Sequence, residues 1–243
     1  IVSATTDADW FSLTLAAGDT VFLSLDPNPE RDHITWNPQL RFGLFDQIPV
    51  VNDAGMTTEN SEALFLTVKK AGVYYPVVLH SEPMTPSTYY LSASVFPRPA
   101  EICTTYNSDS SVALPPLSTS ESAISVGDGS RIGRLRVTLN LTHTNLPDLD
   151  VMLRDPQGDE IGLFTDVSSD AIFIFDVDMT LDDDAAVPLD SFSSKKNLVY
   201  RPAKEYLLGW DEGQPRRGTW ELVVRSDGVA GYGVLQDWAL EIC

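Results

Sequence analysis

The chain has 243 residues, of which 43% are hydrophobic and 21% charged, so it suits one large or two smaller folded domains. It contains no apolar run of about 18 residues, and no membrane-spanning helix is expected. The formal net charge of −19 argues against nucleic acid and anionic membranes as partners, because these need clustered Lys and Arg. An acidic surface instead suits divalent cations.

Short strands dominate the first part of the chain. Apolar residues alternate over residues 11–15 and resume over 21–25 after an Ala-Gly-Asp turn, which predicts a hairpin. Similar runs, bounded by Gly, Pro, Asp or Asn, predict further strands at 39–45, 63–68, 73–79 and 89–96. The segment FPRPAEIC, residues 96–103, has two prolines and no alternation, so it predicts an extended linker. We therefore expect domains of residues 1–97 and 98–243.

The second part continues the strand pattern. Residues 134–143, RLRVTLNLTH, alternate without a fault and place four aliphatic residues on one face. Further strands are predicted at 148–154, 173–181, 219–224 and 235–242. Many short strands separated by Gly- and Pro-rich turns predict an all-β protein of two jelly-roll β-sandwich domains in tandem.

One stretch, THTNLPDLDVMLRDPQG over residues 142–158, holds a histidine close to two aspartates. Alternation puts His143 on the apolar face with Leu139 and Leu141, so we expect it to be a structural residue at the core margin. The sequence contains neither a Gly-x-Ser-x-Gly elbow nor a His-Glu-x-x-His motif. Our expectation is that the chain is not an enzyme and carries no catalytic residues.

Carboxylates are more densely clustered in the sequence than candidate catalytic residues. In FDVDMTLDDD, residues 175–184, five acids fall within nine positions and repel one another. Ca²⁺ takes six to eight oxygen ligands and would relieve that repulsion, and two aspartates before a neighbouring strand could complete its shell. The alternative is a solvated acidic rim without metal. We expect calcium, with these ligands: Asp148, Asp150, Asp178, Asp183 and Asp184.

The chain has two cysteines, Cys103 and Cys243, and the second is its last residue. If they pair, the disulfide staples the start of a long segment to its end and contributes about 4 to 5 kcal/mol in the chain-entropy model. Pairing would indicate an oxidising, secreted setting, whereas the alternative is two unrelated thiols. We predict the disulfide.

From Ile124 onward the sequence resembles the P domain of subtilisin-like proprotein convertases. The resemblance rests on motifs in the family's order: His143-Thr144, Asp148-Leu149, Pro156-Gln157-Gly158, Asp183-Asp184, Gly218-Thr219-Trp220, and the run GVLQDWAL at 233–240. It covers about 120 residues. It implies a non-catalytic β-sandwich that helps a neighbouring catalytic domain to fold, often with calcium, and it makes Asp148, Asp183 and Asp184 the first-choice ligands.

The first 97 residues resemble the bacterial pre-peptidase C-terminal (PPC) domain. The matching segments are DADWF at 7–11, LAAGD at 15–19, AGVYY at 71–75 and YYL at 89–91. Both families are β-sandwich modules attached to secreted proteases, and neither brings catalytic residues of its own.

Together these features predict a non-catalytic accessory region of a secreted bacterial protein, at the C-terminal part of an extracellular subtilisin-like or other protease. Its expected partner is the adjacent catalytic domain of that protein, a serine-type endopeptidase for the subtilisin-like case. The alternative is a cell-surface adhesive module that binds carbohydrate or protein. Exposed aromatic residues lining a groove, such as Trp36 or Trp210, would favour sugar binding.

Overall fold

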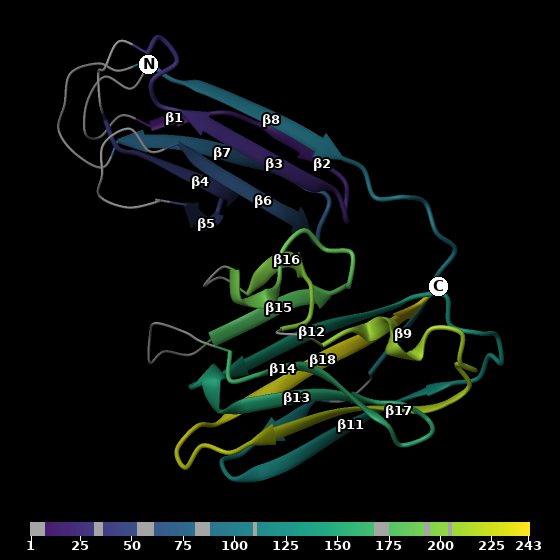
Figure 1. Ribbon diagram of the computed structural model, residues 1–243. Coiled ribbons are helices and arrows are strands. Elements are labelled where there is room, and N and C mark those ends of the chain that lie inside the picture. The colour runs from purple at the N-terminus through teal and green to yellow at the C-terminus, as the bar shows by residue number, and fades with distance from the viewer. Residues whose placement is uncertain are drawn as a thin grey trace. The chain divides into compact units, whose positions relative to one another are not determined.

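The computed structural model describes residues 8–31, 36–52, 61–80, 88–108, 111–167, 175–191, 195–203 and 206–243 (Figure 1). The chain divides into two compact units, Ile1–Arg98 and Pro99–Cys243, called unit 1 and unit 2 below. The described residues form strands and three short 3-10 turns, with no α-helix among them. The predicted all-β fold is confirmed.

Unit 1 is built from two antiparallel layers. Its strands are β1 (Ala8–Trp10), β2 (Leu13–Leu15), β3 (Thr20–Asp26), β4 (Pro38–Leu44), β5 (Gln47–Asn52), β6 (Glu62–Val68), β7 (Gly72–His80) and β8 (Tyr90–Phe96). One layer has the order β1-β7-β4-β5, with β2 also beside β7, and in the other β3 lies between β6 and β8. Aliphatic residues of β3 and β6 and aromatic residues of β4 and β7 fill the core between the layers.

The hairpin predicted over residues 11–25 is wrong. Strand β2 pairs with β7, whereas β3 pairs with β6 and β8, so the chain changes layer between them. The turn is held by Asp19, whose Oδ2 accepts the amide N–H of Ala16 at 2.8 Å, and by Gly18 at a φ of 87°. Leu15 and Val21 are both buried in the core, because the inner faces of the two layers pack against each other.

Unit 2 contains ten strands and three 3-10 turns among its described residues. The strands are β9 (Thr104–Asn107), β10 (Val112–Leu114), β11 (Ser118–Val126), β12 (Leu135–His143), β13 (Leu149–Arg154), β14 (Glu160–Thr165), β15 (Phe175–Leu181), β16 (Lys196–Tyr200), β17 (Gly218–Ser226) and β18 (Gly233–Ile242). The turns are η1 (Leu146–Asp148), η2 (Leu189–Ser191) and η3 (Leu208–Asp211).

These strands form a sandwich of two layers. In one, β12 lies between β18 and β15, β16 runs parallel to β15, and β9 and β10 pair with β18. In the other the order is β11-β17-β13-β14 (Figure 1). Trp220 and Trp238 are fully buried between them; the Trp238 indole N–H donates to Ser122 Oγ at 3.0 Å. The predicted alternation of β12 is confirmed, since its odd-numbered residues from Leu135 to His143 are all buried.

Between β8 and β9 the chain has no regular secondary structure, from Pro97 to Cys103. Two prolines in this segment remove backbone donors and disfavour a helix. The boundary between the two compact units falls within it, between Arg98 and Pro99.

Candidate cation site

The structure does not bring the five predicted calcium ligands together, which corrects the idea of a single shell. Strands β12 and β15 are antiparallel, with His143 opposite Phe175 and Val137 opposite Leu181. Asp183 therefore follows β15 beside the start of β12, whereas Asp148 follows the end of β12. A nine-residue strand is about 25 Å long, so these two carboxylates cannot share one ion.

The other two predicted ligands lie elsewhere again. Asp178 is in the middle of β15, opposite Asn140 of β12 and Lys196 of β16. Asp150 belongs to the other layer, where it lies on β13 opposite Thr165 and Arg225. Acids that are close in sequence do not meet here, because the residues of an extended strand are spaced along its length.

Asp148 lies in a turn organised by His143. The His143 ring is buried; its Nδ1 lies 2.6 Å from the carbonyl oxygen of Asn145, and its Nε2 has no partner among the described residues. Burial lowers the pKa of His143, so the neutral ring is favoured. Asp148 accepts a hydrogen bond from the Asn145 side chain, and its carboxylate fills space left by Gly228 and Gly231. His143 thus anchors the turn, as its parity predicts.

Asp183 and Asp184 lie in an acidic pocket of unit 2. Its lining combines four acids with one cation: Glu101, Asp183, Asp184, Glu212 and Arg134, together with Gly133, Leu135 and Gly209. Asp183 fixes the start of η3, since its Oδ1 accepts the N–H of Leu208 at 3.0 Å and its Oδ2 that of Gly209 at 2.7 Å. A Cβ at Gly209 would lie 3.3 Å from both Asp183 Oδ2 and Glu212 Oε1, so these two carboxylates converge there.

Sequence reasoning missed Glu101 and Glu212. Glu101 lies in the linker segment two residues before Cys103, and the predicted disulfide was a signal that this segment returns to the end of β18. For Glu212 the sequence offers no signal, because only the packing of η3 brings this residue to the end of β15.

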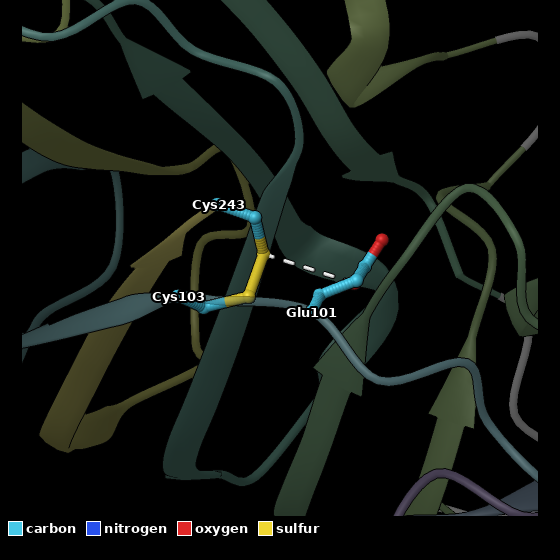
Figure 2. A group of neighbouring side chains, drawn as sticks. All are labelled: Glu101, Cys103 and Cys243. Atoms are coloured by element: carbon cyan, nitrogen blue, oxygen red, sulfur yellow. Dashed lines mark hydrogen bonds between the residues drawn. A yellow bond between two sulfur atoms is a disulfide. The ribbon is translucent and has the colours of Figure 1, made fainter.

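A disulfide joins Cys103 and Cys243 beside this pocket, with an S–S distance of 2.07 Å. Figure 2 shows the Glu101 carboxylate next to it, with Oε2 at 3.8 Å from the sulfur of Cys243. Glu101 and the two sulfurs are close enough to surround a metal ion, but a disulfide offers no thiolate. We therefore assign this group a structural role.

Two arginines, Arg136 of β12 and Arg134 just before it, neutralise acids around the disulfide. Arg136, although on the polar face of its strand, is only 3% exposed and forms ion pairs with Glu101, Asp182 and Glu241. Arg134 pairs with Glu101, Asp182 and Asp184. Glu101 and Asp184 thus already have cationic partners, whereas Asp183 is held by backbone amides.

No protein-family model matches the chain, and no curated protein matches it. Some solved structures share part of its shape. A serine protease of Aeromonas sobria, in complex with the chaperone, is 16% identical over 60% of this chain and 27% of that one, with a TM-score of 0.37. A β-porphyranase of glycoside hydrolase family 86 from Bacteroides plebeius is 11% identical over 96% of this chain and 36% of that one, with a TM-score of 0.34. This chain spans about a third or less of those proteins, and the scores are too low to carry a functional argument.

Proposed function

We propose that the chain is a non-catalytic accessory region of a secreted bacterial protein, at the C-terminal part of an extracellular subtilisin-like or other protease. In this proposal unit 1 is a PPC-like module and unit 2 a P-domain-like module that supports the adjacent catalytic domain. The motifs of unit 2 support this assignment, since Gly218-Thr219-Trp220 and the run at 233–240 form strands β17 and β18 of one sandwich.

The observation that carries the proposal is the closure of unit 2 on itself. The Cys103–Cys243 disulfide ties the residue before β9 to the residue after β18, and the ion pairs of Arg136 lie against it. Adjacent ends allow a folded module to be attached to a larger protein without disturbing either core. A disulfide also suits an oxidising compartment, in keeping with secretion.

The proposal includes the binding of calcium in the acidic pocket. Asp183 Oδ2 and Glu212 Oε1 already converge beside Gly209, and Asp184 and Glu101 lie on the same lining. Carboxylate oxygens are the ligands that Ca²⁺ prefers, and its flexible coordination tolerates water in the remaining positions. Binding there would stiffen the join between β15, η3 and the linker.

We expect millimolar Ca²⁺ to raise the unfolding midpoint of unit 2 above its value in chelator, by roughly 5 °C at a hundredfold excess over Kd, because the ion binds the folded state alone. Differential scanning calorimetry of the full chain measures this shift. Asp183→Asn/Asp184→Asn should reduce it, while Asp176→Asn, at an acid of β15 paired with Lys196, should not. Equal calcium-induced shifts in both variants would show that calcium does not bind in this pocket. Peptide hydrolysis by the chain alone would refute a non-catalytic role.

A surface of unit 1 favours the second candidate function, an adhesive module for carbohydrate. Trp10, Phe45 and Tyr75 form a three-ring cluster with centroids 5.7–6.0 Å apart, and Phe45 is 72% exposed. Of the two tryptophans named from the sequence, Trp36 is buried and donates to Pro27 O, while Trp210 is exposed. Aromatic faces are common platforms for the apolar face of sugar rings.

For this alternative we expect polysaccharide gels to retard the chain in affinity electrophoresis. Trp10→Ala should abolish the retardation, because it removes one of the three mutually contacting rings of the cluster. Phe22→Ala is the matched control, since Phe22 is exposed to a similar degree but pairs with Phe65 on the other layer. Equal mobility of wild type and both variants in every gel would exclude the aromatic cluster as a sugar platform.

A further inference from the structure

Strand β8 lies at the edge of its layer in unit 1. It pairs with β3 along its whole length of seven residues without a register shift, and its other edge faces no strand among the described residues (Figure 1). A strand in this position presents a row of unpaired N–H and C=O groups that can pair with another strand. The free edge of β8 is therefore a template for one more strand.

The edge of β8 lacks the features that usually protect such strands. Charged side chains, proline and bulges commonly keep an exposed edge from pairing with another chain. In unit 2 the edge strands β11 and β14 carry Glu121 and Glu160, both paired with Arg154. Strand β8 has the sequence YLSASVF, without charge or proline. In a chain with a formal net charge of −19, this uncharged edge lets two copies approach with little repulsion.

One face of β8 is apolar and uncovered. Its alternate residues lie opposite buried aliphatic residues of β3 and continue the core-facing side of the layer: Leu91, Ala93 and Val95. Ala93 and Val95 are nevertheless exposed, Val95 by 40%, and Leu91 is half-buried. The described residues of the opposite layer thus leave this face open to water, and a further strand would bring apolar side chains against it.

The sequence of β8 is complementary to itself in an antiparallel pairing. With Ala93 opposite Ala93 of a second copy, the remaining residues form three kinds of pair, each occurring twice: Leu91 with Val95, Ser92 with Ser94, and Tyr90 with Phe96. Aliphatic, hydroxyl and aromatic side chains each meet a partner of their own kind, and such cross-strand pairs stabilise a sheet. The pairing has two-fold symmetry, which closes a dimer.

We propose that β8 is an interaction surface for a second copy of this chain, which pairs with it antiparallel about a two-fold axis at Ala93. The two layers join into one continuous sheet, in which Tyr90 and Phe96, 64% and 54% exposed in the single chain, pack against each other across the interface. A single pair of strands buries less surface than a stable interface, so the dimer is weak and depends on concentration. This surface is independent of the proposed function.

Sedimentation equilibrium of the full chain tests the proposal. The apparent mass should rise from that of one chain, 26.7 kDa, towards twice that value as the concentration increases from micromolar to near millimolar. Ala93→Lys places two like charges opposite each other at the axis and should raise the dissociation constant roughly tenfold or more. The matched control is Ala63→Lys, at an exposed alanine of β6 in the same layer, which should leave self-association unchanged.

A charge swap identifies the edge itself. Ala93→Glu alone should be as monomeric as Ala93→Lys, whereas an equimolar mixture of the two should regain the dimer, because Glu and Lys then meet across the axis. Recovery in the mixture also shows that both variants keep their fold. A wild type that stays monomeric at every concentration, as when another segment or another protein occupies this edge, overturns the proposal. A dimer that Ala93→Lys leaves intact, or a mixture in which the dimer does not return, overturns it as well.

Discussion

Replacing both cysteines, Cys103→Ala/Cys243→Ala, lowers the free energy of unfolding of unit 2 by roughly 5 kcal/mol in our expectation. The disulfide closes a loop with a sequence separation of 140, and the stabilisation grows with the logarithm of that length because the crosslink restricts the unfolded chain. Such a loss is comparable with the whole stability of many domains. Urea denaturation followed by tryptophan fluorescence measures it, since Trp220 and Trp238 are buried in unit 2.

Unit 1 provides the internal control for this experiment. It contains neither cysteine, so its own transition should keep its midpoint in the variant. Wild type in reducing agent should reproduce the variant, which separates the crosslink from the change of side chain. If the free energy of unfolding falls by less than about 1 kcal/mol in both the variant and the reduced wild type, the disulfide is not a main source of stability of unit 2.

Arg136→Met is expected to cost about 3–5 kcal/mol. Arg136 is 3% exposed and donates from Nε to Asp182 Oδ2 at 2.6 Å, while its two other nitrogens pair with Glu101 and Glu241. Methionine fills much of the same volume but leaves these carboxylates facing one another without their cation, and breaking a buried pair from one side carries a penalty of that size. Chemical denaturation at pH 7 gives the value.

The matched control is Arg154→Met on the other layer. Arg154 also contacts three carboxylates, Glu121, Glu160 and Glu221, but its side chain is 25% exposed. Water screens ion pairs of this kind, so the loss of stability should be much smaller than for Arg136→Met. Adding Asp182→Asn to Arg136→Met should restore part of the stability, because it removes one of the unpaired charges. Equal losses in the two arginine variants would show that burial does not set the importance of the Arg136 network.

Strand positions and facing directions could be predicted from the sequence alone. Alternation over residues 134–143 places Leu135, Val137, Leu139, Leu141 and His143 inward, and the structure buries all five. The signal is local, because side chains on a strand alternate between its two faces whatever the strand pairs with. The same local rule shows why the hairpin was wrong: two alternating runs around a turn look alike whether the chain stays in one sheet or crosses to the next.

Burial of charge could not be predicted in this way. Parity assigns Arg136 to the polar face of β12, and that assignment holds, yet the residue is buried because Glu101, Asp182 and Glu241 cover it from other parts of the chain. The contact of Asp183 with the amides of Leu208 and Gly209 likewise depends on how η3 packs, which no spacing in the sequence encodes.

The sequence by itself determined the all-β class, the strand segments and the acidic composition, because these depend on residue type and on a period of two along the backbone. It also placed the two cysteines where a disulfide would close unit 2. Only the tertiary structure decided which strands pair and therefore which acids meet. Antiparallel pairing of β12 and β15 separates Asp148 from Asp183, while the packing of η3 brings the amides of Leu208 and Gly209 to the Asp183 carboxylate. Contacts between such distant segments are set by the tertiary packing and not by spacing along the chain.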